Sequence, residues 1–232
     1  MERRRVPELM DDPGLPEGDH VAALRGLARL NRAAFAHRIA WPSVRRVAAS
    51  AAREGRTAVV LDAACGSADA VVTLAARAQR AGLRIRWRAC DISPRALEVA
   101  GRAARSAGLA LETCTADAVT GPLPAGNDLV TCSLFLHHLD RDDAVRALAA
   151  MRAAAASGAV VDLDRTAAGL ALAWAGSRLL TRSPVVHFDA TASVRAAWTP
   201  EEALAMARDA GIERPRTIDA RPQRWLLRWG DA

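Results

Sequence analysis

The sequence predicts a doubly wound α/β domain, in which helices cover both faces of a mostly parallel sheet. Short apolar runs of strand type alternate with helical segments of roughly ten to fifteen residues over most of the chain. Glycines close several of these helices, and Ser-Pro or Thr-Pro pairs open others. Two strand-like runs at the C-terminus follow each other without a helix, which predicts an antiparallel hairpin. The sheet is therefore expected to have seven strands.

The first two strands and their helices have clear end signals. The run 57–62 is apolar and ends in an acid, and a helix over 69–81 follows it before a glycine. The second strand, 84–90, alternates apolar residues with arginines. Ser93 caps the next helix and Pro94 opens it. This order of strand, turn and helix is the repeating unit of a parallel sheet.

The alternation of strands and helices continues through the middle of the chain. The third strand covers 109–115, and the fourth covers 128–132 after a turn region rich in proline and glycine. A helix with an acidic first turn is expected over 140–156, and the fifth strand over 159–163. Each of these strands brings its carboxyl end to the same edge of the sheet.

Helical segments lie outside this core at both ends. Residues 1–18 are expected to be irregular, 19–39 to form one helix, and a second helix to begin at Pro42. The segment 165–198 is longer than a simple connection needs to be and reads as an insertion on the substrate side. It is expected to hold an apolar helix and then an irregular stretch over 183–192. The chain thus divides into an N-terminal helical part, 1–56, and a domain over 57–232 that includes the insertion at about 165–198 and ends in strands at about 213–219 and 223–229.

Composition limits the class of protein. Apolar residues make up 51% of the chain and charged residues 25%, which is typical of a globular domain. No apolar run reaches the roughly 20 residues of a membrane span. The N-terminal arginines are followed by proline and acids, without the apolar region of a signal peptide, so a cytoplasmic location is expected.

The basic balance does not by itself indicate a nucleic-acid partner. The formal charge is +6 and the isoelectric point is about 10.6. The chain contains no lysine, and its arginines are scattered, whereas nucleic-acid binding proteins gather their basic residues in a patch. The four cysteines form no CxxC pair and no zinc-binding pattern, so neither a disulfide framework nor a metal site is expected. A nucleic-acid partner is therefore considered unlikely, and the oligomeric state stays open.

Acidic and small residues follow the predicted strands at the edge where parallel α/β sheets bind ligands. Asp62 ends the first strand and a turn of small residues leads to Asp69. Asp91 ends the second strand, where a carboxylate suits the two hydroxyls of a ribose. Asp117 follows the third strand and Ser133 the fourth. These positions are the candidates for a nucleotide-like cofactor.

The stretch Val59-Val-Leu-Asp-Ala-Ala-Cys-Gly-Ser-Ala-Asp69 resembles motif I of the class I S-adenosylmethionine-dependent methyltransferases. The family pattern D-x-G-x-G-x-G is met as Asp62, Ala64, Gly66 and Ala68, so alanine replaces two of three glycines. The resemblance implies a Rossmann-like fold, S-adenosylmethionine as cofactor, and an N-terminal lid over 1–56. The cofactor-binding residues it implies are Asp62, Ala64, Cys65, Gly66, Asp69, Asp91, Ile92, Asp117, Ala118, Ser133 and Leu134.

Three histidines are candidates for the catalytic base. His137 and His138 follow the fourth strand in the run Ser133-Leu-Phe-Leu-His-His-Leu, which is similar to quinone-type and small-molecule methyltransferases. His187 lies in the insertion. Imidazole titrates near neutrality, and a base is needed when the acceptor keeps its proton. A single turn is expected to direct only one of the adjacent pair into the cavity.

These features predict transfer of a methyl group to a hydroxyl oxygen or an activated carbon of a small acceptor, aromatic or polyketide- and quinone-like. Apolar residues in the expected lid, Phe35, Leu170 and Leu179, suit such an acceptor. Two alternatives stay open from the residues alone. One is an RNA-modifying methyltransferase, and the other is a non-catalytic partner protein, for which the alanines of the loop are the support.

Overall fold

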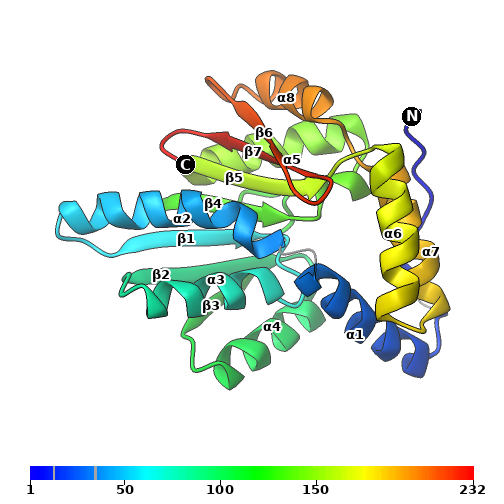
Figure 1. The fold of residues 1–232 in the computed structure, drawn as a ribbon. Coiled ribbons are helices and arrows are strands. Elements are labelled where there is room, and N and C mark those ends of the chain that lie inside the picture. The colour runs from blue at the N-terminus through cyan, green and yellow to red at the C-terminus, as the bar shows by residue number, and fades with distance from the viewer. Residues whose placement is uncertain (13, 34–35) are drawn as a thin grey trace.

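The computed structural model describes residues 1–12, 14–33 and 36–232. Its centre is a seven-stranded sheet with the order β3-β2-β1-β4-β5-β7-β6 (Figure 1). All neighbouring strands are parallel except β7, which runs antiparallel to both β5 and β6. The strands are β1 Ala58–Ala63, β2 Ile85–Asp91, β3 Leu111–Thr115, β4 Asn127–Ser133, β5 Ala155–Leu163, β6 Arg216–Ala220 and β7 Arg224–Trp229. The predicted fold class, with its C-terminal hairpin, is confirmed.

Helices cover both faces of this sheet and its carboxyl edge. They are η1 Leu9–Asp11, α1 Glu17–Ala33, α2 Ala36–Arg53, α3 Asp69–Arg80, α4 Pro94–Ser106, η2 Leu136–His138, α5 Arg141–Ala154, α6 Ala167–Leu180, α7 Pro184–Ala196 and α8 Pro200–Asp209. Within the described ranges, none of these helices combines the length and the apolar character of a membrane span.

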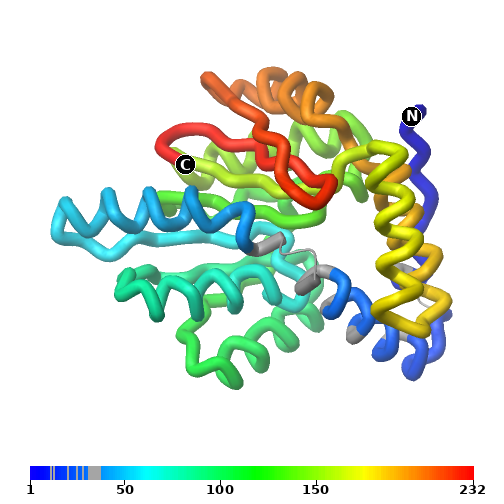
Figure 2. The backbone as a smooth tube through the Cα atoms, in the orientation of Figure 1, coloured from blue at the N-terminus to red at the C-terminus, as the bar shows by residue number. Residues whose placement is uncertain are grey.

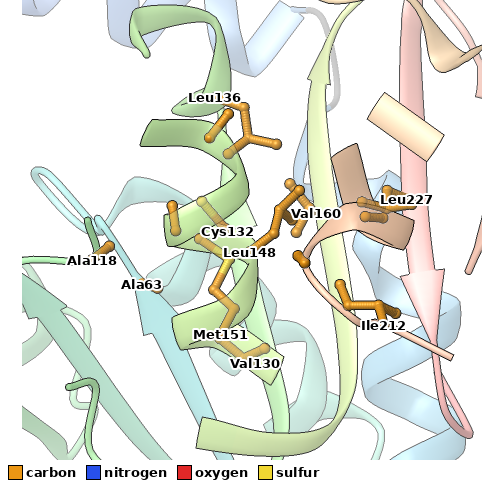
Figure 3. Packing of buried hydrophobic residues seen from close by; sticks show 14 of the residues in the cluster. Ala63, Ala118, Val130, Cys132, Leu136, Leu148, Met151, Val160, Ile212 and Leu227 are labelled. Atoms are coloured by element: carbon orange, nitrogen blue, oxygen red, sulfur yellow. The ribbon is translucent and has the colours of Figure 1, made fainter. Parts of the chain in front are cut away.

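The core is divided by the sheet, because successive side chains of a strand point to opposite faces. Leu61 of β1 packs in the layer formed with α5 and α8, whereas Val60 packs in the layer formed with α2, α3 and α4. Figure 3 shows the first layer, with Leu148 and Met151 of α5 lying against the strands. Both layers are apolar, as the continuous apolar runs of the central strands require.

Three helices close around the carboxyl edge of the sheet. Helices α6 and α7 pack against each other and against α1, and together they form the wall seen at one end of the molecule in Figure 1. The N-terminal segment runs beside α7 in Figure 2, where the Arg4 amide donates to the Arg195 carbonyl at 2.9 Å. The beginning and the middle of the chain therefore meet at this edge.

The expected irregular stretch over 183–192 is wrong, because this segment is helix α7. Ser183 caps the helix by accepting from the Val186 amide, and a proline occupies its first turn. Val185, Val186 and Val194 are buried. Helix formation there follows from burial, since β-branched residues have only modest helix propensity.

The N-terminal helices also begin and end elsewhere than expected. Helix α2 starts at Ala36, six residues before Pro42, and continues through this proline. Trp41 and Val44 are buried on both sides of it, and this packing holds the helix together despite the missing amide. The expected helix over 19–39 ends at Ala33, and Phe35 lies outside the described residues.

The fifth strand is longer than expected at its start. It begins at Ala155 rather than at residue 159, and Ala155 pairs with Asn127 of β4. The run of alanines before it has no period that would separate the end of a helix from the start of a strand. Pairing with a neighbouring strand decides the boundary.

Candidate active site

A cavity of about 510 Å³ lies between the carboxyl edge of the sheet and the wall of helices α1, α6 and α7. Its lining residues come from the turn after β1, the turn after β4, the turn before β7, and the helical wall. They are Glu8, Met10, Leu27, Leu30, Ala64–Ser67, Asp69, Ala70, Thr73, Ser133, Leu134, His137, His138, Leu163, Gly169, Leu172, Ala173, Gly176, Leu180, Val186, Asp189, Ala190, Ser193, Val194 and Pro222–Arg224. Segments far apart in the sequence therefore share one site.

The turn after β1 has the backbone of a glycine-rich loop, although two of its residues are alanines. Ala64, Gly66 and Ala68 all have positive φ, at 50°, 52° and 61°. This left-handed region costs an L-residue roughly 1–2 kcal/mol, so both alanines are strained. Apart from Gly66 and its two chain neighbours, no atom of the described residues lies within 4 Å of the position that a Cβ on Gly66 would take, so a ligand can approach the backbone there. The loop keeps the shape of the motif at a cost in stability.

Asp62 lies beneath this loop and does not line the cavity. Its carboxylate accepts a hydrogen bond of 2.7 Å from the Thr131 hydroxyl on the adjacent strand. Burial raises the pKa of Asp62 to about 7, and the nearby Asp91 adds to the rise, while the Thr131 hydrogen bond opposes it. A cationic group bound nearby would keep this carboxyl ionised.

The acid after β2 is joined to the loop after β1. One oxygen of Asp91 accepts from the Gly66 amide at 2.8 Å, and the other accepts from the Ser93 amide at 2.9 Å. Each carboxylate oxygen can accept a further hydrogen bond, so two remain for a ligand diol. Ile92 beside it is 65% exposed and offers an apolar surface.

Asp117 and Ala118 follow β3, outside the lining of the cavity. Asp117 accepts from the Val119 amide at 2.8 Å and from the Thr120 hydroxyl, and these two bonds lower the pKa of its carboxyl. Ala118 is buried in the core layer of α5 and α8. Asp91 and Asp117 thus extend the row of acidic side chains along the carboxyl edge of the sheet, beyond the cavity.

Of the predicted cofactor residues, the structure gathers six around the cavity: Ala64, Cys65, Gly66, Asp69, Ser133 and Leu134. Leu134 also has a positive φ of 58°, so the backbone after β4 is strained where it meets the site. Asp69 accepts a hydrogen bond of 3.0 Å from the Ser67 hydroxyl. The others, Asp62, Asp91, Ile92, Asp117 and Ala118, continue along the same edge.

His137 forms a buried pair with Asp162 of β5. Its Nδ1 lies 2.6 Å from Asp162 Oδ1, and its backbone amide donates to Asp162 Oδ2 at 3.1 Å. Burial acts to lower the pKa of His137, but the adjacent carboxylate outweighs it, so the pKa lies above its usual value. The imidazolium in turn holds the pKa of Asp162 below its usual value despite complete burial. With Nδ1 bound to the carboxylate, Nε2 is the nitrogen left to act on a ligand.

His138 lies next to this pair but behaves differently. The two imidazole rings are 4.1 Å apart, and burial together with the charge of His137 lowers the pKa of His138 to about 3. Glu8 from the N-terminal segment reaches both rings, with its Oε1 3.9 Å from His137 Nε2 and from His138 Nδ1. His138 therefore stays neutral over the range in which His137 changes charge.

His187 is placed on α7 and does not line the cavity. Its Nε2 lies 2.9 Å from the Thr181 carbonyl oxygen, within the connection between α6 and α7. The neighbouring Val186 is the residue that faces the site. Among the three candidate histidines, only His137 and His138 are brought together there.

Several site residues could not be found from the sequence. Arg3 donates to the carbonyls of Leu139 and Ala196 at 2.7 Å and stacks over the Trp198 ring, and it thereby fixes the N-terminal segment that carries Glu8. No motif marks these residues or Arg224, which also lines the cavity. Asp162 is an acid near the end of a strand and His137 was a candidate base, but nothing in the sequence indicates that the two are paired.

The site fits the chemistry of S-adenosylmethionine. The open approach over Gly66 admits a ligand against the backbone, Asp91 has oxygens left for ribose hydroxyls, and Ile92 offers an apolar surface for a purine ring. Cys65 and Gly66 of the loop also line the cavity, and the Gly66 amide is the one that donates to Asp91.

Known proteins share this domain and this fold. A family model described as "Methyltransferase domain" matches residues 60–158. The S-adenosylmethionine-dependent methyltransferase SibL, in its apo form, has a TM-score of 0.68 at 20% identity over 98% of this chain and 63% of its own. No curated protein sequence matches the chain.

Two further solved structures with a similar fold contain bound small molecules. The plantazolicin methyltransferase BamL, with a triazolic desmethylPZN analogue and SAH, has a TM-score of 0.58 at 18% identity over 81% of this chain and 66% of its own. An O-methyltransferase family 2 protein from Planctomyces limnophilus, in complex with apigenin, has a TM-score of 0.54 at 19% identity over 75% and 50%. The chain thus spans half to just under two thirds of the length of these three structures.

Residues 60–158, which hold β1 to β4 and the loop after β1, match a methyltransferase domain. The fold of the chain is similar to that of solved S-adenosylmethionine-dependent methyltransferases.

Proposed function

We propose that this enzyme methylates a hydroxyl oxygen or an activated carbon of a small, aromatic or polyketide-like acceptor, with His137 as the general base. The observation that carries the proposal is the buried His137–Asp162 pair, whose histidine lines the same cavity as the loop after β1. The acceptor atom must lie near both. A base held at that place can remove its proton as the methyl group arrives.

The cofactor residues in this proposal are those at the carboxyl edges of β1, β2, β3 and β4. Asp91 would hold the ribose, Ile92 and the Asp117–Ala118 pair the adenine, and the turn from Ala64 to Asp69 the methionine part with Asp62 beneath it. When bound, S-adenosylmethionine supplies an electrophilic methyl group. The contribution of the protein is to hold the acceptor in line with it and to exclude water.

Asp162 sets the protonation of the base. Its carboxylate accepts the Nδ1–H of the neutral imidazole, so the lone pair of Nε2 is free to take a proton from the acceptor. The same carboxylate stabilises the imidazolium that results, which is the reason for the raised pKa of His137. His138, whose pKa is about 3, has no such role in this proposal.

The acceptor side is proposed to be covered by two segments, the N-terminal lid over 1–56 and the insertion over 165–198. Leu30 of α1, with Leu172 and Ala173 of α6, gives the cavity an apolar wall. An apolar wall suits a ring or an alkyl chain better than a polynucleotide. The bound apigenin and desmethylPZN analogue of the two similar structures support an acceptor of this kind.

Two measurements test the proposal. Calorimetry with S-adenosylhomocysteine should detect binding, and Asp91→Ala should weaken it about 10- to 100-fold, because charge-assisted hydrogen bonds to the ribose are lost. Mass spectrometry should then detect methylation within a panel of phenols, enols and polyketide-like acids. His137→Gln should slow that transfer by about 10²- to 10⁴-fold without changing the affinity for S-adenosylhomocysteine, and His138→Gln serves as the matched control.

The results separate the alternatives. Absence of cofactor binding by the native protein would overturn the proposal in favour of a non-catalytic partner protein. Methylation of RNA, with tight binding that weakens steeply with salt, would identify an RNA-modifying enzyme. Full activity of His137→Gln would show that His137 is not the base, and it would leave the assignments of the fold and the cofactor unchanged.

A further inference from the structure

The side chain of Arg224 is a buried cation without an ion pair. It is 7% exposed, and its Nε has no hydrogen-bond partner among the described residues. Its Nη1 makes one long hydrogen bond, of 3.4 Å, to the Pro222 carbonyl. Within the same part of the chain it forms no salt bridge, and burial lowers the pKa of Arg224 more than the Asp162 carboxylate on the adjacent strand raises it. A buried charge left in this state is costly, and an anionic ligand would offset the cost.

Arg224 lies on the acceptor side of the cavity. It begins β7, opposite Leu163 at the end of β5, and the turn before it packs against the start of α6, as Figure 1 shows. Two strand spacings, roughly 10 Å, separate β7 from β4, and a third separates it from β1. The cofactor loop after β1 is therefore distant from Arg224. Asp162 of β5, which pairs with His137, lies on the strand between β4 and β7.

The acidic side chains in the cavity lining, and Asp162 beside it, have interaction partners other than Arg224. Both oxygens of Asp162 are bonded to His137 or to the Leu163 amide, and Asp189 accepts the amides of Leu9 and Met10. Glu8 faces the two imidazoles. Arg224 is the one permanently charged cation among the described lining residues, and the remaining lining acid, Asp69, accepts from the Ser67 hydroxyl on the cofactor loop.

We propose that Arg224 binds a carboxylate of the acceptor, which makes the acceptor a hydroxylated aromatic or polyketide-like acid. A guanidinium presents a planar fork of N–H donors that matches the two oxygens of a carboxylate. Leu163 and Leu172 are apolar residues that line the same cavity as Arg224 and His137. The inference rests on the proposed function, and it fixes the orientation of the acceptor, with its acid at Arg224 and its reacting atom at His137.

The probes for the test are 4-hydroxybenzoate and its methyl ester, titrated into the protein saturated with S-adenosylhomocysteine. The wild type should bind the acid about 10- to 100-fold more tightly than the ester, as expected for a charge-assisted hydrogen bond. Arg224→Met should bind the two alike and keep its affinity for S-adenosylhomocysteine. Arg224→Lys, which keeps the charge without the fork, should retain an intermediate preference.

Arg228→Met is the matched control, because Arg228 lies on the same strand, four residues on, and donates to the Ala232 carbonyl rather than into the cavity. It should keep the full preference for the acid. Three results would overturn the proposal: equal binding of acid and ester by the wild type, binding of neither at millimolar concentration, or an unchanged preference in Arg224→Met. If Arg224→Met does not fold, the test rests on the ratio of the affinities for the acid and the ester, measured for the wild type and for Arg224→Lys. Failure of the proposed function is separate, since it appears as absence of S-adenosylhomocysteine binding.

Discussion

Replacement of Asp162 by Asn should lower the pKa of His137 from above its usual value to below it. The carboxylate is what holds this pKa up, whereas burial acts in the opposite direction and would then prevail. His137 should therefore lose its proton at lower pH in the variant. If it is the base, the acidic limb of the pH–rate profile should move to lower pH, and the plateau should fall.

The contacts of Asp162 allow the size of the effect to be worked out. Asp162 Oδ1 meets the Leu163 amide at 2.7 Å and His137 Nδ1 at 2.6 Å, and Oδ2 meets the His137 amide at 3.1 Å. The amide nitrogen of Asn should occupy the Oδ2 position, because only one donor opposes it there and at the longer distance. The tautomer of His137 is then kept, and one buried backbone amide loses its acceptor, which costs about 1–3 kcal/mol. For a chain of this length, that lowers Tm by roughly 2–12 °C.

The stability difference between wild type and Asp162→Asn should also depend on pH. The raised pKa of His137 contributes stability below its unfolded value of 6.5, and this contribution is lost as pH rises through the folded pKa. The lowered pKa of Asp162 contributes stability above 3.8, lost as pH falls through its folded pKa. The wild type should therefore exceed the variant most between about pH 4 and pH 6.5, where both groups are charged in the unfolded chain as well.

Nuclear magnetic resonance of the imidazole Cε1 protons measures the titration without any acceptor. The chain has five histidines, and His137→Gln assigns the relevant signal by its disappearance. A pKa for His137 in Asp162→Asn that equals or exceeds the wild-type value would refute the reasoning. Thermal unfolding at several pH values checks the stability window on the same samples.

Three further outcomes follow from the structure. His138→Gln should leave the acidic limb of the rate profile in place and change turnover less than tenfold, because His138 has a pKa of about 3 and is already neutral there; a displaced limb would contradict this. Ala64→Gly should stabilise the fold by about 0.5–1 kcal/mol in urea unfolding, since it relieves a φ of 50°. Gly158→Ala should cost about 3 kcal/mol or more, because its Cβ would lie 2.0 Å from the Trp229 ring, whereas Gly101→Ala meets only the flexible end of an arginine and should be neutral or stabilising.

The cofactor edge of the site was accessible to sequence reasoning because it is built locally. Asp62, Asp91 and Asp117 each follow their own strand, and parallel strands carry such positions to one edge whatever the details of packing. The turn from Ala64 to Ala68 was recognised by spacing, although its glycines are reduced to one. Its left-handed backbone confirms that the shape of the loop survives the substitution by alanine.

The acceptor side was less accessible because its groups come from segments without a common pattern. Glu8 lies in a lead-in that reads as irregular, and only the hydrogen bonds of Arg3 to Leu139 and Ala196 bring it to the histidines. Helix α7 was not predicted because its valines have a low helix propensity, and their burial, which stabilises the helix, is not visible in the sequence. His187 has the right residue type, but the helix directs it to the Thr181 carbonyl.

By itself, the sequence determined the alternation of strands and helices, the hairpin and the residues at each strand end, since these depend on periodicity and on caps within a few positions. Only the tertiary structure decided which histidine is paired with an acid, which segments line the cavity, and that the buried Arg224 Nε finds no hydrogen-bond partner among the described residues. Those properties depend on contacts between residues that are far apart in the sequence. Burial and the electrostatic field at a side chain exist only once the chain has folded.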